Sequence, residues 1–221
     1  MSLKLFVFDM AGTTVKDEGV VLAAFLDVAA ANGLAAEPAW ITARMGWDKA
    51  TVFRELLQRA GADTAPAARL AAEFQAHLAA RYEDDPPRPI PGVIEAFRAL
   101  AQRDIEVAFT TGFARATADL ILDHLGWSAH ISVASDEVDH GRPAPDLLFE
   151  AMRQAGVHDA RAVGAAGDTP SDLLAGFAAG CGLVIGVGTG SHTLDELEPH
   201  PHTHLLPDLS GLADLIDAYA P

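Results

Sequence analysis

Three carboxylates and several small polar residues stand in short segments that each follow an apolar run of the chain. Asp9 stands in the first of these segments, and Asp168 and Asp172 stand in the last. Carboxylates that converge on one point repel one another unless a cation lies among them. Hard oxygen ligands suit Mg²⁺, which often binds one or two carboxylates together with a substrate phosphate. These residues therefore predict a Mg²⁺ site.

Hydrogen-bond donors stand in the two segments between. Thr110 offers a hydroxyl, Arg142 a guanidinium, and the turn at Gly112 offers backbone amides. Donors of these kinds bind phosphoryl oxygens. A carboxylate nucleophile, a divalent cation and an anion-binding cradle together are typical of phosphoryl transfer through an aspartyl-phosphate. We therefore expect a small substrate that carries phosphorus.

Short apolar runs that end in turn residues predict buried strands ahead of these segments. The expected strands are residues 3–8, 105–109, 131–133, 162–166 and 183–187. Helical patterns separate them, so the sequence predicts a Rossmann-like α/β fold, a doubly wound parallel sheet with helices on both faces. In such sheets ligands bind at the carboxyl ends of the strands, where the four polar segments fall.

Residues 15–85 interrupt this alternation, because they show helical patterns and no convincing strand. Helices are expected over about 20–31 and 48–60, and a third is expected after Pro66. The third helix carries apolar residues at four-residue spacing: Leu70, Phe74, Leu78 and Tyr82.

A proline-rich stretch at 84–91 is typical of a stiff linker. We therefore predict a helical cap, residues 15–87, inserted into a core made of residues 1–14 and 88–221. The Leu70, Phe74 and Leu78 stripe either packs inside this cap or forms the contact of a homodimer.

The charge balance argues against two classes of partner. Fifteen basic residues face 31 acidic ones, for a formal net charge of -16. Such an acidic surface disfavours nucleic acids and anionic membranes, and no apolar run reaches the roughly 18 residues of a membrane helix. We expect no secretory signal, because no basic stretch followed by an apolar run is found at residues 1–30. Cys181 is its single cysteine, which excludes an internal disulfide, and a cytoplasmic protein is the expectation.

The four segments, in this order and context, resemble the four motifs of the haloacid dehalogenase superfamily over essentially the whole chain. Their sequences are Asp-Met-Ala-Gly-Thr at 9–13, Thr-Thr-Gly at 110–112, Gly-Arg-Pro-Ala-Pro-Asp at 141–146 and Gly-Asp-Thr-Pro-Ser-Asp at 167–172. The resemblance implies that Asp9 is the nucleophile and a Mg²⁺ ligand. It implies that Asp168 is a metal ligand, that Asp172 binds the metal directly or through its waters, and that Thr110 and Arg142 hold the phosphoryl group.

The resemblance also implies roles for neighbouring groups. The backbone carbonyl of Ala11 is expected to reach the metal. Four further residues are expected to line the substrate site: Gly12, Thr13, Thr111 and Gly112. The alternative for each motif taken alone is an ordinary turn or a capped helix start.

Ala11 departs from the common pattern of the superfamily. Phosphatases of the superfamily carry a second Asp at this position, two residues after the nucleophile, as a general acid and base. Losing such a group costs about 10²–10⁴-fold in ester hydrolysis. Ala11 therefore indicates either a protein that only binds a phospholigand, or a leaving group that needs no acid here.

The phosphonatase branch, which contains phosphonoacetaldehyde hydrolase, has the same Ala. It also has an Arg in the third motif, as Arg142 is here. Its cap carries a lysine four residues after the Met of a Met-Gly pair. Met45, Gly46, Trp47 and Lys49 match that spacing, and the first three are expected at the substrate site.

The resemblance to this branch implies that Lys49 forms a Schiff base with the carbonyl of phosphonoacetaldehyde or a related 2-oxoalkylphosphonate. The C–P bond then breaks to an enamine while Asp9 takes the phosphoryl group. A carbon leaving group stabilised in this way needs no acid at Ala11.

Local physics favours a neutral amine at Lys49. Asp48 is a predicted N-cap, which puts Lys49 in the first helical turn, where an ammonium is disfavoured. The apolar face of Val52, Phe53 and Leu56 would desolvate it further. The alternatives are a cation that only grips the substrate, and a solvated surface lysine.

Val52 departs from phosphonoacetaldehyde hydrolase itself, which has His at this position. The chain therefore fits a sister group of that enzyme, and a phosphomonoester phosphatase or a sugar-phosphate mutase of the same superfamily remains the alternative.

Three other features draw notice. His200, His202 and His204 are expected in a surface loop before a last short strand, and the Gly-rich stretch 186–190 is expected to be a turn. Trp40 and Trp47 are either a roof over the site or ordinary packing.

Overall fold

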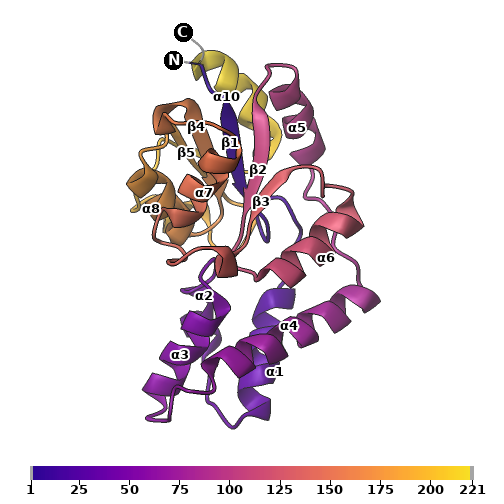
Figure 1. The fold of residues 1–221 in the computed structure, drawn as a ribbon, viewed down its shortest axis with the longest axis vertical. Coiled ribbons are helices and arrows are strands. Elements are labelled where there is room, and N and C mark those ends of the chain that lie inside the picture. The colour runs from indigo at the N-terminus through magenta and orange to yellow at the C-terminus, as the bar shows by residue number, and fades with distance from the viewer. Residues whose placement is uncertain (1, 220–221) are drawn as a thin grey trace.

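The computed structural model describes residues 2–219, in which a parallel sheet is flanked by helices. The described strands lie in the order β3-β2-β1-β4-β5-β6, and all neighbours pair in parallel. Their bounds are β1 Leu5–Asp9, β2 Glu106–Thr110, β3 Ile131–Val133, β4 Val163–Gly167, β5 Leu183–Val187 and β6 His204–Leu206. The expected doubly wound α/β fold is confirmed (Figure 1).

Helices cover both faces of this sheet because its strands are apolar on both sides. In β1, Phe6 and Phe8 pack into one buried cluster, while Leu5 and Val7 belong to another on the opposite face. The first cluster includes α5 Val93–Ala101, α6 Arg115–Leu125 and α10 Leu212–Tyr219. The second includes α7 Asp146–Gln154 and α8 Pro170–Ala179, and α9 Leu194–Leu197 lies beside β5 and β6. Short 3-10 turns are η1 Ser135–Glu137, η2 Ala160–Ala162 and η3 Leu209–Gly211.

Three strands end slightly later than the sequence predicted. β1 extends to Asp9, and β2 and β4 are each shifted by one residue, because the parallel pairing continues as far as Asp9 opposite Thr110. Asp9 and Thr110 are therefore the last strand residues and not the first loop residues. Regular hydrogen bonding positions the backbone of both.

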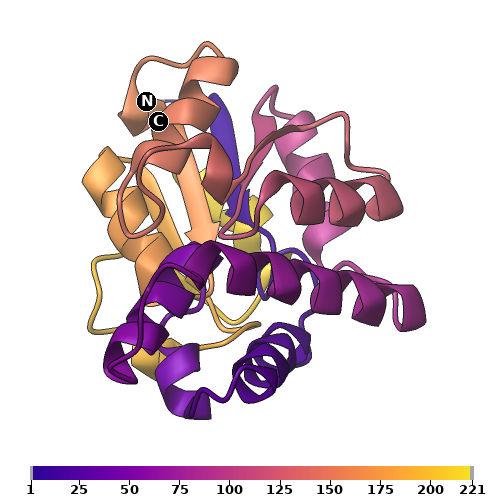
Figure 2. The same ribbon diagram turned by 60° about the horizontal axis from the view of Figure 1, so that its bottom comes forward.

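Four helices gather below the carboxyl edge of the sheet (Figures 1 and 2). They are α1 Val20–Ala31, α2 Pro38–Thr42, α3 Lys49–Arg59 and α4 Ala67–Asp84. The ring of Phe25 in α1 lies 5.1 Å from that of Phe53 in α3 and 4.5 Å from that of Phe74 in α4. Leu70, Phe74 and Leu78 are all buried. The stripe therefore packs internally, and it is not the surface of a homodimer contact.

The chain crosses between the sheet and these helices at two points, and the two crossing segments lie side by side. Lys16 N–H donates to the Arg88 carbonyl and Ile90 N–H donates to the Thr14 carbonyl, each at 2.9 Å. Between them, Val15 forms an antiparallel bridge with Pro89. Within residues 2–219, no helix is both long enough and apolar enough to span a membrane.

Candidate active site

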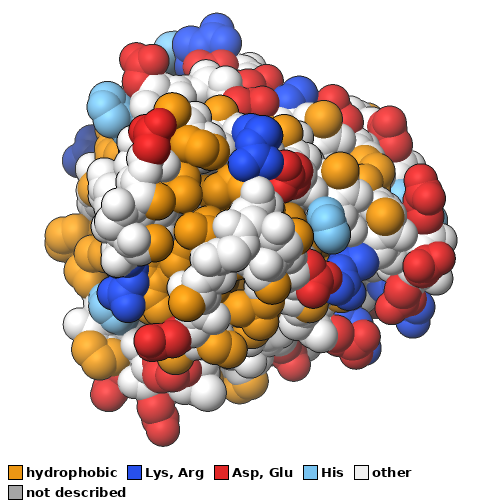
Figure 3. Space-filling model, turned by 90° about the horizontal axis from the view of Figure 1, so that it is seen from below, with side chains coloured by type: hydrophobic (Ala, Val, Ile, Leu, Met, Phe, Trp, Pro, Cys, Tyr) orange, Lys and Arg blue, Asp and Glu red, His pale blue; other side chains and the backbone are white. Residues whose placement is uncertain are grey.

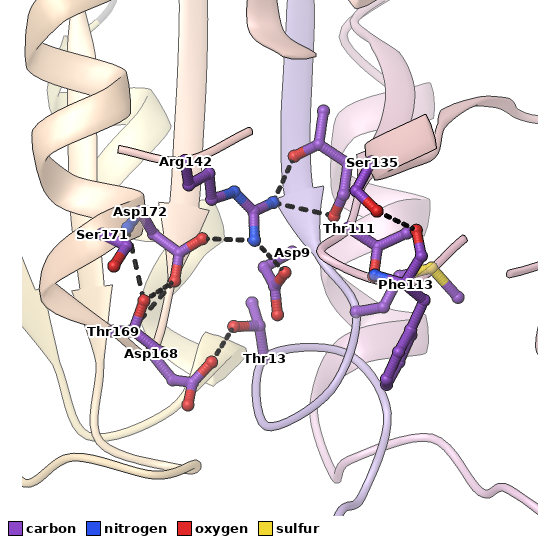
Figure 4. A network of polar contacts seen from close by, with 12 residues as sticks. Asp9, Thr13, Thr111, Phe113, Ser135, Arg142, Asp168, Thr169, Ser171 and Asp172 are labelled. Atoms are coloured by element: carbon purple, nitrogen blue, oxygen red, sulfur yellow. Dashed lines mark hydrogen bonds and ion pairs between the residues drawn. The ribbon is translucent and has the colours of Figure 1, made fainter. Parts of the chain in front are cut away.

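The candidate residues meet at the carboxyl edge of the sheet, where the chain reverses its strand order between β1 and β4. Asp9 ends β1, Thr110 ends β2, and Asp168 follows β4 directly. Figure 4 shows the side chains of Asp9, Arg142 and Asp172 pointing toward one another, with that of Asp168 beside them and directed at Thr13. All of these residues are buried. The sequence-based expectation that the four segments converge agrees with this placement.

Arg142 is the positive centre of the cluster. Its Nη1 pairs with Asp9 and lies 2.8 Å from Asp172 Oδ1. Its Nη2 donates to the Thr110 carbonyl at 2.8 Å and to the Thr110 hydroxyl at 2.6 Å. Burial opposes the charged form, but attraction to Asp172 and Asp9 raises the pKa of the guanidinium. Arg142 therefore stays charged and joins the ends of two strands to α8.

Asp9 is buried among these groups, with its backbone carbonyl bonded to the Thr14 hydroxyl at 2.9 Å. Burial raises the pKa of Asp9 to about 6, and the charge of Asp172 acts in the same direction, whereas Arg142 lowers it. The carboxylate is thus poorly solvated. A carboxylate in this state is a stronger nucleophile than one in water.

Asp168 is held by loops on either side. Thr13 donates to its Oδ1 at 3.1 Å, and the backbone N–H of Ser191 donates to its Oδ2 at 2.7 Å. Gly12 and Gly190 lie so close that a Cβ on either would come within 2.6 Å of Asp168 Oδ2. Both loops must therefore carry glycine at this approach, which makes the carboxylate position rigid.

The acidic residues have the donor chemistry of a Mg²⁺ site. Burial, followed by the charges of Asp9 and Asp172, raises the pKa of Asp168 well above its usual range. A cation near these oxygens would relieve that repulsion. Asp172 Oδ1 has no hydrogen-bond partner, apart from its ion pair with Arg142. The donor set therefore fits a hard divalent ion.

The expected metal cluster is nevertheless not preformed. In the described part of the chain, no three His, Cys, Asp or Glu residues are grouped as a metal site would require. Arg142 instead supplies the positive charge between Asp9 and Asp172. Binding of an ion by Asp9, Asp168 and Asp172 therefore requires a shift of side chains.

Asp172 also has a local structural role. Its Oδ2 accepts the Thr169 N–H at 3.0 Å and the Thr169 hydroxyl at 2.6 Å. Thr169 in turn caps the N-terminus of α8, so the pair forms a capping box. The alternative of a capped helix start thus describes this motif correctly. The ion pair to Arg142 adds a second role that the capping pattern did not predict.

Lys49 faces the cluster from the other side. As predicted, Asp48 caps α3 by accepting the Thr51 N–H at 2.8 Å, and Lys49 begins the helix. Lys49 is only 5% exposed, so the alternative of a solvated surface lysine is wrong. Burial lowers the pKa of Lys49 to about 8, while Asp9 and Asp48 oppose this change.

One cavity connects the two groups. Its wall contains Asp9, Ala11 and Lys49, and Met45, Gly46, Thr111 and Gly112 from the predicted substrate site also line it. Gly12 and Thr13 do not line it, because they support Asp168 and the neighbouring loop from behind.

The face of the molecule on the α1–α4 side has hydrophobic side chains in its middle and acidic ones around its rim (Figure 3).

Residues 45–47 lie in close contact with the sheet edge at Gly112, and we call this contact the seam. Gly112 lies so close that an added Cβ would come within 2.5 Å of the Gly46 carbonyl oxygen and 2.6 Å of that of Trp47. The Trp47 indole N–H donates to the Ser171 hydroxyl at 2.7 Å. Trp47 therefore ties the segment to α8 and does not line the cavity. Trp40 packs elsewhere, with the Arg44 guanidinium 3.8 Å from its ring centre.

Sequence analysis missed several residues at or near the cavity, among them Val21 and Phe113, which line it. Asp17 and Ser191 line it, and Thr189 donates to the Gly12 carbonyl at 2.7 Å. The stretch 186–190 contains the end of β5 and the expected turn, but its proximity to Asp168 was not foreseen. The glycine-rich composition was the only available signal. His200 and His202 lie in the segment before β6, as predicted, and His204 is the first residue of that strand; no metal group includes them in the described residues.

Comparison with known proteins identifies the class of this chain. A family model described as haloacid dehalogenase-like hydrolase matches residues 3–180. The chain therefore belongs to the haloacid dehalogenase-like hydrolases, and it is an enzyme.

Individual relatives narrow the comparison. A phosphonoacetaldehyde hydrolase of Bacteroides fragilis is 30% identical over 223 residues, which cover 93% of this chain and 82% of that protein. A hydrolase from Pseudomonas syringae superposes with a TM-score of 0.88 at 22% identity, over 99% of this chain and all of that one. A phosphonoacetaldehyde hydrolase-like protein from Oleispira antarctica gives 0.87 at 18% identity, over 99% and 92% of the two chains. The two structures show that the fold is shared.

Proposed function

We propose that this chain hydrolyses the C–P bond of phosphonoacetaldehyde or a related 2-oxoalkylphosphonate. The observation that carries the proposal is the burial of Lys49 in the same cavity as Asp9, with a pKa lowered to about 8. An amine that is partly neutral near pH 8 can attack a carbonyl, and a carboxylate beside it can attack phosphorus. The 30% identity to a phosphonoacetaldehyde hydrolase supports the same substrate class.

The first part of the proposed reaction uses Lys49. Its neutral Nζ attacks the substrate carbonyl carbon, and the resulting carbinolamine loses one water to give an iminium. The Lys49 Nζ lies 4.9 Å from the ring centre of Phe113 and 5.8 Å from that of Phe25. These rings stabilise a cation without a carboxylate partner. They therefore suit both the ammonium and the iminium.

The second part uses Asp9. Its carboxylate attacks phosphorus, the C–P bond breaks, and its electron pair moves into the iminium to give an enamine. Arg142 and Thr110 hold the phosphoryl oxygens during this step. Because the leaving carbon is stabilised by the iminium, no acid is required at Ala11. One water then hydrolyses the aspartyl-phosphate, the enamine takes a proton on carbon, and a second water frees the carbonyl product from Lys49.

We include Mg²⁺ in the proposal, with Asp9, Asp168, Asp172 and the Ala11 carbonyl as the groups that would hold it. The ion would supply positive charge that neutralises the phosphoryl oxygens and the crowded carboxylates. The donor chemistry described above supports this assignment.

We further propose that residues 15–87 act as a cap over a core of residues 1–14 and 88–221. The paired crossings at Lys16–Arg88 and Thr14–Ile90 support a hinge there. Closure of the cap would exclude water from the cavity and bring Lys49 to the substrate. Residues 1, 220 and 221 lie outside the described part of the core.

Borohydride reduction tests the imine directly. The chain is incubated with phosphonoacetaldehyde and borohydride, and peptide mass spectrometry locates the adduct, which is expected on Lys49. Asp9→Asn is expected to abolish phosphate release while still allowing the adduct to form. Turnover without any trappable adduct, or faster release of phosphate from simple phosphate esters, would favour a phosphatase or mutase instead.

A further inference from the structure

A second cavity opens beside the one that contains Asp9 and Lys49. It has a volume of about 360 Å³, and the two cavities share Asp17, Met45 and Ser191 as wall residues. We call this second space the side chamber. Its other walls come from the loop before α1, from Leu22 in α1, from Thr42 at the end of α2 and from Thr189 and Gly190 after β5. Segments of the helices below the sheet and of the loop after β5 therefore line this space, which is partly open to solvent.

The size of the side chamber exceeds what the smallest substrate needs. The carbonyl carbon of phosphonoacetaldehyde carries only a hydrogen beside its phosphonomethyl group. A volume of 360 Å³ lies within the range of small-molecule sites. Since Asp17, Met45 and Ser191 line both spaces, the chamber is the neighbouring space toward which an arm on the carbonyl carbon would extend when the carbonyl lies at the amine.

The charges around the side chamber limit the arm. Lys16, Asp17 and Glu18 are its charged wall residues. Lys16 is already ion-paired with Glu18, which leaves the carboxylate of Asp17, partly offset by the charge of Lys49 in the adjoining cavity, as the remaining charge on the wall. Asp17 is fixed by the Val21 N–H, 2.9 Å from its Oδ1. A carboxylate on the arm would face this charge, whereas the Leu22 and Met45 side chains offer apolar contact.

The structure assigns the side chamber to an arm on the carbonyl carbon of the substrate, so that the substrate is a ketone of the 2-oxoalkylphosphonate class with a neutral or cationic arm. This assignment rests on the proposed function. It implies that the chain prefers ketones with several carbons in the arm, and that it rejects an arm of equal length that ends in a carboxylate.

Phosphate release from a substrate series tests the assignment. The series is phosphonoacetaldehyde, 2-oxopropylphosphonate, 2-oxopentylphosphonate and the arm of similar length ending in a carboxylate. Each methylene buried in the chamber is expected to raise kcat/KM about fourfold, so the propyl arm, with two more methylenes, should exceed the methyl arm by about 15-fold. The carboxylate arm is expected to fall at least about tenfold below the propyl arm.

Two variants show whether the gain arises in the chamber. Leu22→Trp fills it, and the ratio of kcat/KM between propyl and methyl arms is expected to fall toward one. Leu174→Trp, at a surface leucine of α8 that is 37% exposed, is expected to keep the wild-type ratio. Thr42→Phe fills the chamber from another wall and replaces Leu22→Trp if that variant unfolds.

The outcomes separate the assignment from the proposed function. Turnover of phosphonoacetaldehyde without any gain from longer arms, or an equal loss for all substrates in Leu22→Trp, would mean that the chamber is only an entrance. That result would overturn the assignment alone. If no carbonyl phosphonate releases phosphate, both the proposed function and the assignment are wrong.

Discussion

Lys49 Nζ donates a hydrogen bond to the backbone carbonyl oxygen of Trp47, 3.0 Å away. This bond keeps the amine at the first turn of α3, on the side of the cavity that faces Asp9. The carbonyl is a neutral acceptor, so the bond does not counter the effect of burial as strongly as a carboxylate would. The position of the amine and its lowered pKa therefore arise from the same local structure.

The rate of borohydride trapping at Lys49 is expected to rise with pH and then to level off above pH 8. Burial lowers the pKa of Lys49 from 10.5 to about 8. Only the neutral amine reacts, and its fraction rises from about 9% one unit below the pKa to about 91% one unit above it. Quantitative mass spectrometry of the reduced adduct across this range gives the profile. A rate that continued to climb about tenfold per unit up to pH 10 would show an ordinary exposed amine.

Replacing Lys49 by Met is expected to lower phosphate release from a carbonyl phosphonate on the order of 10⁴-fold, as for loss of a covalent catalyst. The free energy of unfolding should not fall, because Met fills a similar volume and removes a buried amine. Steady-state kinetics and urea unfolding measure the two quantities. Lys4→Met, at an exposed lysine, is the matched control and should retain wild-type rates. Full activity of Lys49→Met would exclude the imine.

Gly112→Ala is expected to lower kcat/KM about 10²-fold, the scale of a misplacement of about 1 Å. The new Cβ would lie 2.5 Å from the Gly46 carbonyl oxygen, so residues 45–47 must move away from the sheet edge. Lys49 would move with them. Gly211→Ala, where the nearest atom is 3.6 Å from the added Cβ, should have little effect. Unchanged kinetics in Gly112→Ala would show that the seam does not position the amine.

Cys181 is expected to react slowly with thiol reagents in the folded chain. Burial raises the pKa of Cys181 to about 12, so the thiolate fraction near neutral pH is very small. Absorbance after addition of a disulfide reagent should show slow modification in buffer and fast modification in denaturant. Equal rates in the two conditions would contradict the raised pKa of this half-buried thiol.

Sequence periodicity predicted the elements well where the apolar pattern was continuous. Residues 183–187 and 20–31 were predicted with the bounds that the structure has, because an uninterrupted buried strand and a long helix have clear local signals. Asp9, Thr110 and Asp168 were predicted to meet, since the carboxyl ends of parallel strands share one edge. The roles of these residues stay proposals.

The rest of the site depends on contacts that no local pattern encodes. Arg142 pairs with Asp9 across 133 positions of sequence, and the choice between this pair and a metal cluster depends on side-chain conformation. Asp17 and Ser191 stand in loops without a motif, and only the folded chain brings them to the same cavity. The stripe of Leu70, Phe74 and Leu78 showed a buried face, but periodicity does not say which neighbour covers it.

The paired crossings at Val15 and Pro89 have a consequence for replacing the helices that lie between them in the sequence. Because the chain leaves the sheet and returns to it at adjacent points, the helices between these two points can be replaced as one unit. Such a replacement would not change the order of the strands. A graft that joins the two crossings to another helical set would keep Asp9, Thr110 and Arg142 on the sheet side of the junction. Such a graft would replace Lys49, Leu22 and Met45 together, so the helical walls of both cavities would change in a single step.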